Sequence, residues 1–250
     1  MADLMRTSNP ALNPKAFEGE GASIGEAMTV RGTVNKTGFL LLCVVATAAW
    51  TWKVFMDSGN PQTVVPMLLV GGIGGFIFAL ITMFKKTWAP VTAPIYALLE
   101  GLVLGGISAM FEVRYHGIAI QAVSLTFGTM FALLLAYRSG LIPVTQNFKL
   151  GIIAATGGIA IFYLAQIVLG FFGIHFTTIN GSGPIGIAFS VFVVSVAALN
   201  LVLVFDFIES AAAAGAPKYM EWYGAFGLMV TLIWLYLEIL RLLSKLRSRD

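Results

Sequence analysis

Four carboxylates interrupt or close the long apolar stretches of this 250-residue chain, and they are the residues best suited to do chemistry. Glu100 and Glu238 lie inside two of the apolar runs, and Asp206 and Glu209 close a third. An ionisable side chain in hydrocarbon costs about 2.5 to 3.5 kcal/mol, so such residues face a bundle interior or a wet cavity and mark a pathway. We therefore expect these acids to bind protons or a hard cation such as Ca²⁺, which prefers oxygen ligands.

Glu100 and Asp206 form one pairing that helix geometry allows. If successive helices alternate in direction, both carboxylates lie at a similar depth near the same membrane boundary. Two carboxylates in a partly dry site repel each other unless one takes up a proton, which predicts a proton-sensitive gate or a cation site. The alternative is that Glu100 only bonds the amide of Asn200 or a backbone carbonyl.

Local pairs offer a structural explanation for the other acids. Glu238 and Arg241 are three residues apart on one helix, a spacing that allows a local ion pair and accounts for both residues. Asp206 and Glu209 share the same spacing near a helix end, where both can simply be hydrated. The neutral amide of Asn200 can bond across helices.

The composition identifies the elements that hold these residues. Hydrophobic residues make up 58% of the chain and charged residues 11%, which excludes a water-soluble globular domain. Each apolar run is about 18 to 24 residues long, enough for a helix to cross a bilayer and too continuous for a barrel. The seven runs are 38–55, 64–84, 93–111, 117–137, 150–173, 185–205 and 222–243. We predict an all-α membrane protein, a bundle of seven transmembrane helices.

Three regions follow from these runs. Residues 1–36 form a polar segment, expected to be cytoplasmic and partly disordered, residues 37–246 form the transmembrane domain, and residues 247–250 form a basic tail. Small residues in GGIGG (71–75), EGLVLGG (100–106) and TGG (156–158) are expected to let helix backbones approach closely.

Basic residues in the short connections predict the orientation. Lys and Arg are more numerous on the side that holds the amino terminus, which places that terminus inside the cell. The basic tail disagrees, because an odd number of spans would put it outside. A re-entrant last segment, which keeps both termini inside, is the alternative.

Several functional classes lack their motifs. The basic residues are scattered rather than interleaved with aromatics, so no nucleic-acid partner is expected. No metalloprotease, P-loop or dinucleotide motif occurs, which predicts neither an enzyme nor a bound cofactor other than transient Ca²⁺. The single cysteine, Cys43, excludes a disulfide framework.

Three stretches of the chain resemble a known membrane family. They are SNPALNPKAF near the start, YALLEGLVLGGISAMFE in the third run, and FDFIESAAAAGAPKYMEWYGAFGLMVTLIWLYLEILRLL at the end. They are similar to the bacterial branch of the transmembrane Bax inhibitor motif family, and the likeness extends over nearly the whole chain. The resemblance implies a bundle whose last helix is central, a bacterial cytoplasmic membrane location, and a pH-sensitive calcium leak.

The resemblance also implies a pair of gating acids. In that family two aspartates, one on each of the last two helices, share a proton, and they fall on Asp206 and Glu238 here. The second acid is Glu instead of Asp, and the gap of 32 residues (206 to 238) is wider than the family pattern. Straight helices would offset the two by about 18 Å, so this pairing requires a short oblique helix within 207–221.

Two functions from different classes remain. The first is a passive, pH-sensitive cation leak with Ca²⁺ or H⁺ as partner. In it Asp206, Glu238 and Glu100 sense pH and line the path, and Asp206 and Glu238 are the candidate Ca²⁺ ligands. Secondary candidates are Glu209, Asn200 and Arg241. The second is a membrane scaffold or regulator of a protease or stress-response complex without ion transport. A secondary transporter is disfavoured because no repeat symmetry is visible.

Overall fold

The computed structural model describes residues 27–173 and 176–248. Its long helices are α2 (Val30–Ser58), α3 (Val65–Phe84), α4 (Ala89–Arg114), α5 (Ile118–Arg138), α6 (Gln146–Phe171), α8 (Pro184–Ala213) and α9 (Met220–Arg247). Short helical turns are η2 (Pro61–Thr63), η3 (Lys86–Trp88) and α7 (Thr177–Asn180). All seven long helices are long and apolar enough to cross a membrane, which confirms the predicted architecture.

Local sequence explains where these helices begin. Thr29 caps α2 by accepting a hydrogen bond from the Gly32 N–H, and Thr145 caps α6 by accepting one from Phe148. Pro184 stands at the start of α8, where its missing N–H costs nothing. Helix α2 therefore begins inside the stretch predicted as polar segment 1–36, and residues 1–26 of that prediction lie outside the described residues.

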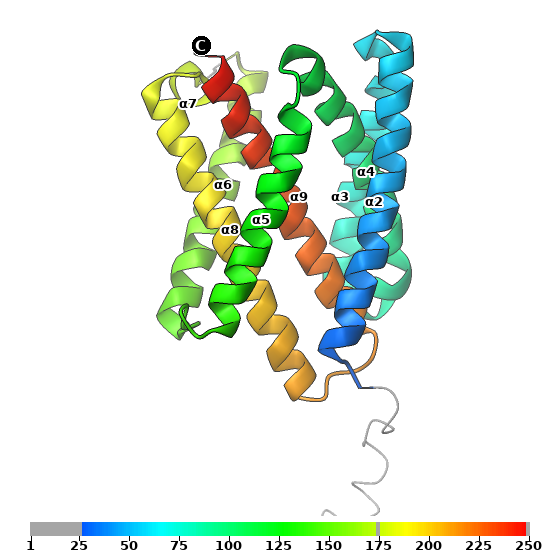
Figure 1. The fold of residues 1–250 in the computed structure, drawn as a ribbon, viewed down its shortest axis with the longest axis vertical. Helices are drawn as coiled ribbons and strands as arrows, with labels where there is room; N and C mark the ends of the chain where they lie inside the picture. The colour runs from blue at the N-terminus through cyan, green and yellow to red at the C-terminus, as the bar shows by residue number, and fades with distance from the viewer. Residues whose placement is uncertain (1–26, 174–175, 249–250) are drawn as a thin grey trace, which may run out of the picture.

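The helices run alternately up and down, and α9 crosses the middle of the bundle (Figure 1). Helix α9 is the most buried of the seven spans and packs against α2, α4, α5 and α8. Its apolar side chains enter two core clusters, one with α5 and α8 and one with α2 and α4. The predicted central position of the last helix is confirmed.

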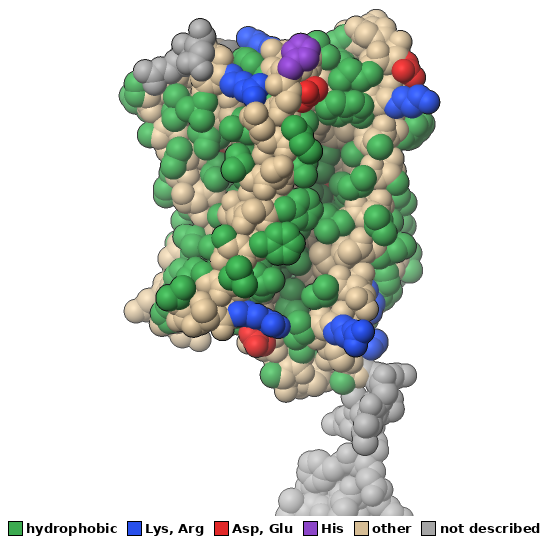
Figure 2. Space-filling view, viewed as in Figure 1, with side chains coloured by type: hydrophobic (Ala, Val, Ile, Leu, Met, Phe, Trp, Pro, Cys, Tyr) green, Lys and Arg blue, Asp and Glu red, His purple; other side chains and the backbone are tan. Residues whose placement is uncertain are grey.

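The two ends of the described chain lie at opposite ends of the bundle. Helix α2 starts at one end, and α9 finishes at the other without a break (Figure 1). The re-entrant alternative for the last segment is therefore wrong. In the face shown in Figure 2, charged side chains gather at both ends and hydrophobic ones occupy most of the band between them, as a bilayer requires.

Glycines bring α2 and α4 into close contact. A Cβ atom at Gly105 would lie 2.2 Å from the carbonyl oxygen of Ala48, so only glycine permits this approach. Gly71 on α3 likewise faces the Leu99 carbonyl of α4. The prediction fails for TGG, because Gly157 and Gly158 on α6 face open space and pack against no neighbouring helix.

Candidate functional site

Helix α6 carries three polar side chains at seven-residue intervals. Lys149, Thr156 and Tyr163 are each two helical turns apart, about 10.5 Å, so they lie on nearly the same face. Each contacts a polar residue of α8 or α9. This face of α6 therefore connects polar groups at three levels of the bundle.

The first level lies at the end of the bundle where α6 begins. Lys149 Nζ is 2.6 Å from Asp206 Oδ2 on α8, and the Asp206 side chain is 20% exposed. One turn further along α8, the exposed Glu209 accepts a hydrogen bond of 2.6 Å from the Tyr137 hydroxyl of α5. Asp206 and Glu209 thus have separate partners on separate helices instead of being simply hydrated.

The middle level is uncharged. The Asn200 amide nitrogen on α8 donates to Thr156 Oγ1 at 2.7 Å and to its own helix at the Val196 carbonyl oxygen at 2.9 Å. Asn200 therefore bonds Thr156 of α6. The alternative in which Asn200 bonds Glu100 is wrong.

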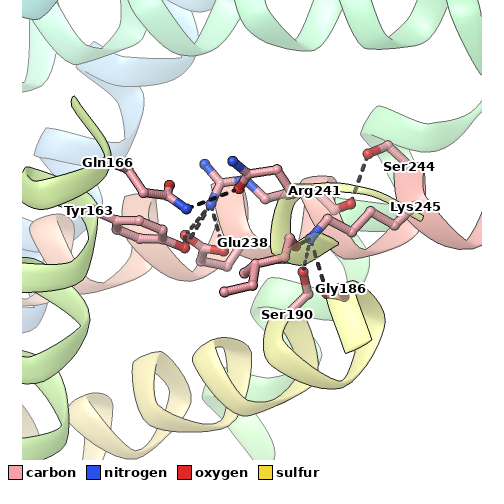
Figure 3. A network of polar contacts seen from close by, with 10 residues as sticks. Tyr163, Gln166, Gly186, Ser190, Glu238, Arg241, Ser244 and Lys245 are labelled. Carbon is pink, nitrogen blue, oxygen red and sulfur yellow. Dashed lines mark hydrogen bonds and ion pairs between the residues drawn. The ribbon is translucent and has the colours of Figure 1, made fainter. Parts of the chain in front are cut away.

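The third level lies toward the carboxyl end of α9 (Figure 3). The Tyr163 hydroxyl donates to Glu238 Oε1 at 2.9 Å, and Arg241 approaches the same carboxylate at 3.2 Å. Arg241 also donates to the Tyr163 hydroxyl at 2.7 Å. The Glu238 side chain is 3% exposed, so these donors replace the water it has lost. The predicted local pair of Glu238 and Arg241 is confirmed.

We refer to these three levels together as the α6 seam. It consists of Lys149, Thr156 and Tyr163 with their partners Asp206, Asn200, Glu238 and Arg241. From Lys149 to Tyr163 the seam extends about 21 Å along the helix axis, most of the thickness of a hydrocarbon core.

The seam corrects the pairing of Asp206 with Glu238. The two acids lie at opposite ends of the seam, one held by Lys149 and the other by Arg241 and Tyr163. Helix α8 continues unbroken to Ala213 and α9 starts at Met220, so the oblique helix that this pairing requires is absent from the described stretch 207–221.

Glu100 lies elsewhere in the bundle, on α4. Its carboxylate faces Gly75 of α3, where an added Cβ would come within 2.8 Å of Oε1. Asp206 has Lys149 as its partner and Asn200 has Thr156, so the predicted contacts of Glu100 with Asp206 and Asn200 do not form. Glu100 is therefore not part of the α6 seam.

These acids do not make a resident calcium site in this conformation. Ca²⁺ takes six to eight oxygen ligands, typically from several carboxylates and carbonyls. Within 27–173 and 176–248, no three residues of the types Asp, Glu, His and Cys come close enough to hold a metal. Joint ligation of one ion by Asp206 and Glu238 stays a prediction, and here each carboxylate faces its own basic residue.

A buried lysine lies beside the third level of the seam. Lys245 is 6% exposed, and its ammonium group donates to the carbonyl oxygens of Ile179 and Gly186 and to Ser190 Oγ (Figure 3). Three acceptors match the three N–H groups of an ammonium. Lys245 therefore joins the end of α9 to the start of α8 and to α7.

A second charged cluster, at the opposite end, was not expected from the sequence. Glu221 is fully buried and accepts hydrogen bonds from the backbone N–H and the hydroxyl of Thr29, both at 2.9 Å. Lys36 and Lys218 form ion pairs with the same carboxylate. Met28 N–H also donates to Ala216 O, so this cluster fastens the start of α2 to the start of α9.

The seven-residue spacing on α6 was the signal that could have revealed the seam. Lys149, Thr156 and Tyr163 stand out only when polar residues are compared at helical intervals along one apolar run. Glu221 gives no such signal, since an acid in the first turn of a helix is ordinarily a solvated residue that favours the helix dipole.

Comparison with known proteins places this architecture in a family. A family model described as "Bax inhibitor 1 like" matches residues 9–248, nearly the whole chain. The comparisons with curated proteins and with solved structures find no match. The seven membrane-spanning helices, the central last helix and the extent of this match agree with one another. The chain belongs to the Bax inhibitor 1-like family of membrane proteins.

Proposed function

We propose that this protein is a passive cation leak of the Bax inhibitor type, and that the α6 seam is its path. The observation that carries the proposal is the seam itself, a row of polar side chains that spans most of the bundle between α6 and α8 and α9. Polar and charged groups at this depth are costly, and in membrane proteins they mark ion and proton routes.

Ion pairs close the seam at both levels where it carries charge. Lys149 forms an ion pair with Asp206 at one end. At the other end Arg241 forms an ion pair with Glu238, and Tyr163 donates a hydrogen bond to it. A cation that enters must compete with these bases for the carboxylate oxygens. A proton that binds Asp206 removes the negative charge that both Lys149 and a cation need. Flux through such a path therefore depends on pH.

An alternative route through the bundle is less suited to a cation. A cavity of about 500 Å³ lies between α2, α4, α5 and α9. Its lining is mainly apolar, with the hydroxyls of Ser108 and Tyr236 bonded to each other at 2.6 Å. It offers few of the oxygen ligands that replace the hydration shell of Ca²⁺.

Ca²⁺ is proposed as the transported ion and not as a resident cofactor. Carboxylate oxygens at each end of the seam are the ligands it prefers, once their basic partners move aside. We propose the cytoplasmic membrane of a bacterium as the location, with the amino terminus inside, because the end holding Lys36, Lys85, Lys86, Lys149 and Lys218 is rich in basic residues.

Calcium flux into liposomes that contain only this protein tests the proposal. Lys149→Met frees Asp206 and is expected to raise ⁴⁵Ca²⁺ flux about fivefold, the scale of an ion pair worth about 1 kcal/mol. Adding Asp206→Asn to it should return flux to or below the wild-type rate, because the freed carboxylate is gone. Lys85→Met, a lysine at the same end of the bundle and outside the seam, is the matched control.

Asp206→Asn alone should change the dependence of Ca²⁺ flux on pH. The amide cannot titrate, so the part of the pH profile that Asp206 supplies is lost. An unchanged profile would remove Asp206 from the gate, and the absence of any flux from the purified wild-type protein would reject the leak.

One observation favours a scaffold without transport as the second candidate. Each carboxylate of the seam already has a basic partner, which is sufficient to explain it as a helix-packing contact. This candidate predicts a stable protein partner during purification and no ion flux from the protein alone. The liposome experiment therefore separates the two functions.

A further inference from the structure

A polar cavity of about 780 Å³ opens at the end of the bundle where α9 finishes. It lies beside the third level of the seam, between the ends of α4, α6 and α9, the end of α7 and the connection from α7 to α8. Its lining residues are Phe111, Arg114, Tyr115, Tyr163, Gln166, Ile167, Asn180, Ser182, Arg241, Ser244, Lys245 and Ser248. Three of them are basic, and no acidic residue is among the described residues that line it.

Arg114 adds to this cavity a positive charge that no ion pair among the described residues balances. It ends α4, and its guanidinium lies 5.5 Å from the ring of Tyr115. None of the carboxylates in the described ranges is within ion-pair distance of it. A guanidinium with free N–H groups at the wall of a cavity is a ready donor for an anion.

Arg241 presents a second set of donors to the same cavity. Its bonds to Glu238 and Tyr163 all come from Nη1, and Nε and Nη2 bond none of the described residues. Figure 3 shows the remaining nitrogen atoms pointing away from Glu238 and Tyr163. Two guanidinium groups therefore line one cavity, each with unused N–H groups.

Lys245 contributes charge without contributing a donor. Its three N–H groups are used by Ile179, Gly186 and Ser190, all neutral acceptors. The single carboxylate beside it, Glu238, already faces Arg241. Among the described residues that line the cavity and their ion-pair partners, three basic groups therefore face one carboxylate.

We propose that this cavity binds a phosphate group between Arg114 and Arg241. The planar fork of a guanidinium matches two phosphate oxygens, and the negative charge of a phosphate offsets positive charge in the cavity. Because the cavity opens at a membrane end, the group belongs to a free phosphate or to the headgroup of an anionic lipid. This inference concerns binding alone and does not depend on cation flux.

Two arms of one experiment test the site and distinguish the two sources. In the first, the protein in phosphatidylcholine nanodiscs is dialysed to equilibrium against [³²P]phosphate. In the second, the protein is extracted from membranes of phosphatidylcholine and phosphatidylglycerol, and bound lipid is identified by native mass spectrometry. Each arm compares the wild type with Arg114→Gln and with Arg138→Gln, an exposed arginine in the last turn of α5.

Arg114→Gln should weaken binding about tenfold or more, the loss expected when a charged hydrogen-bonding partner is removed. Arg138→Gln should bind as the wild type does. An Arg114-dependent loss in the first arm assigns free phosphate, and one in the second arm assigns a lipid headgroup. Equal behaviour of all three proteins in both arms overturns the proposal. Arg114 is exposed, so its replacement leaves the core intact.

Discussion

The role of a buried charged side chain in this bundle depends on its hydrogen-bond and ion-pair partners more than on its depth. Glu221 and Glu238 are both buried acids of α9, yet Glu221 holds the start of α2 and Glu238 belongs to the α6 seam. In each case nearby donors compensate the water lost on burial. Removing a partner therefore costs more than the same change at an exposed site.

Glu221→Gln should lower the free energy of unfolding by about 1 to 3 kcal/mol, because Lys36 and Lys218 lose the carboxylate that balances them. The thermal unfolding midpoint of the purified protein measures this loss. Asp57→Asn, at an exposed position near the end of α2, is the control and should leave the midpoint unchanged. Equal midpoints for the two variants would show that Glu221 does not fasten α2 to α9.

Whole helices are packed through their small residues. Gly105 lets α4 approach the backbone of α2, whereas Gly128 on α5 has open space beside it. The same substitution at these two positions should therefore have opposite effects.

Gly105→Ala should destabilise the protein by at least about 1 to 3 kcal/mol, because the new methyl group overlaps the Ala48 carbonyl and the helices must separate. Gly128→Ala should stabilise it by about 0.5 to 1 kcal/mol, since alanine loses less backbone entropy in a helix. Thermal unfolding of both variants checks the pair. A tolerated Gly105→Ala would contradict the close approach of α2 and α4.

The elements were predictable from the sequence, and their polar contacts were not. Seven apolar runs of membrane-spanning length determine seven helices, and the structure extends most of them by capping residues such as Thr29 and Thr145. Which acid meets which base depends on the rotation of each helix and on its neighbours. The local pair of Glu238 and Arg241 was foreseen because one helix carries both. Lys149 with Asp206 was not, since 57 residues separate them.

At the scale of the molecule, an odd number of spans puts the two described ends of the chain on opposite sides of the membrane. The end with the start of α2 holds most of the lysines. The opposite end holds the cavity with Arg114 and Arg241, whose charge repels cations unless an anion is bound. The two ends therefore differ in electrostatic character.

A reporter fused to the carboxyl terminus should lie outside the cytoplasm when the protein is made in bacteria. Alkaline phosphatase, which is active only after export, should be active in this fusion, because basic residues keep the first end inside. Green fluorescent protein at the same position should stay dark. A fluorescent fusion with inactive phosphatase would reverse the proposed orientation.

The most direct test of the proposed path asks whether cations pass the middle of the α6 seam. In a Cys43→Ser background, Thr156→Cys is exposed to a positively charged methanethiosulfonate reagent while ⁴⁵Ca²⁺ flux is recorded. Ser195→Cys, on the exposed face of α8, is the matched control. We predict that modification stops flux through Thr156→Cys and leaves Ser195→Cys unaffected. Two results would contradict a path along the seam. In one, the vesicles conduct Ca²⁺ but the reagent fails to modify Thr156→Cys; in the other, modified Thr156→Cys conducts as well as the unmodified variant.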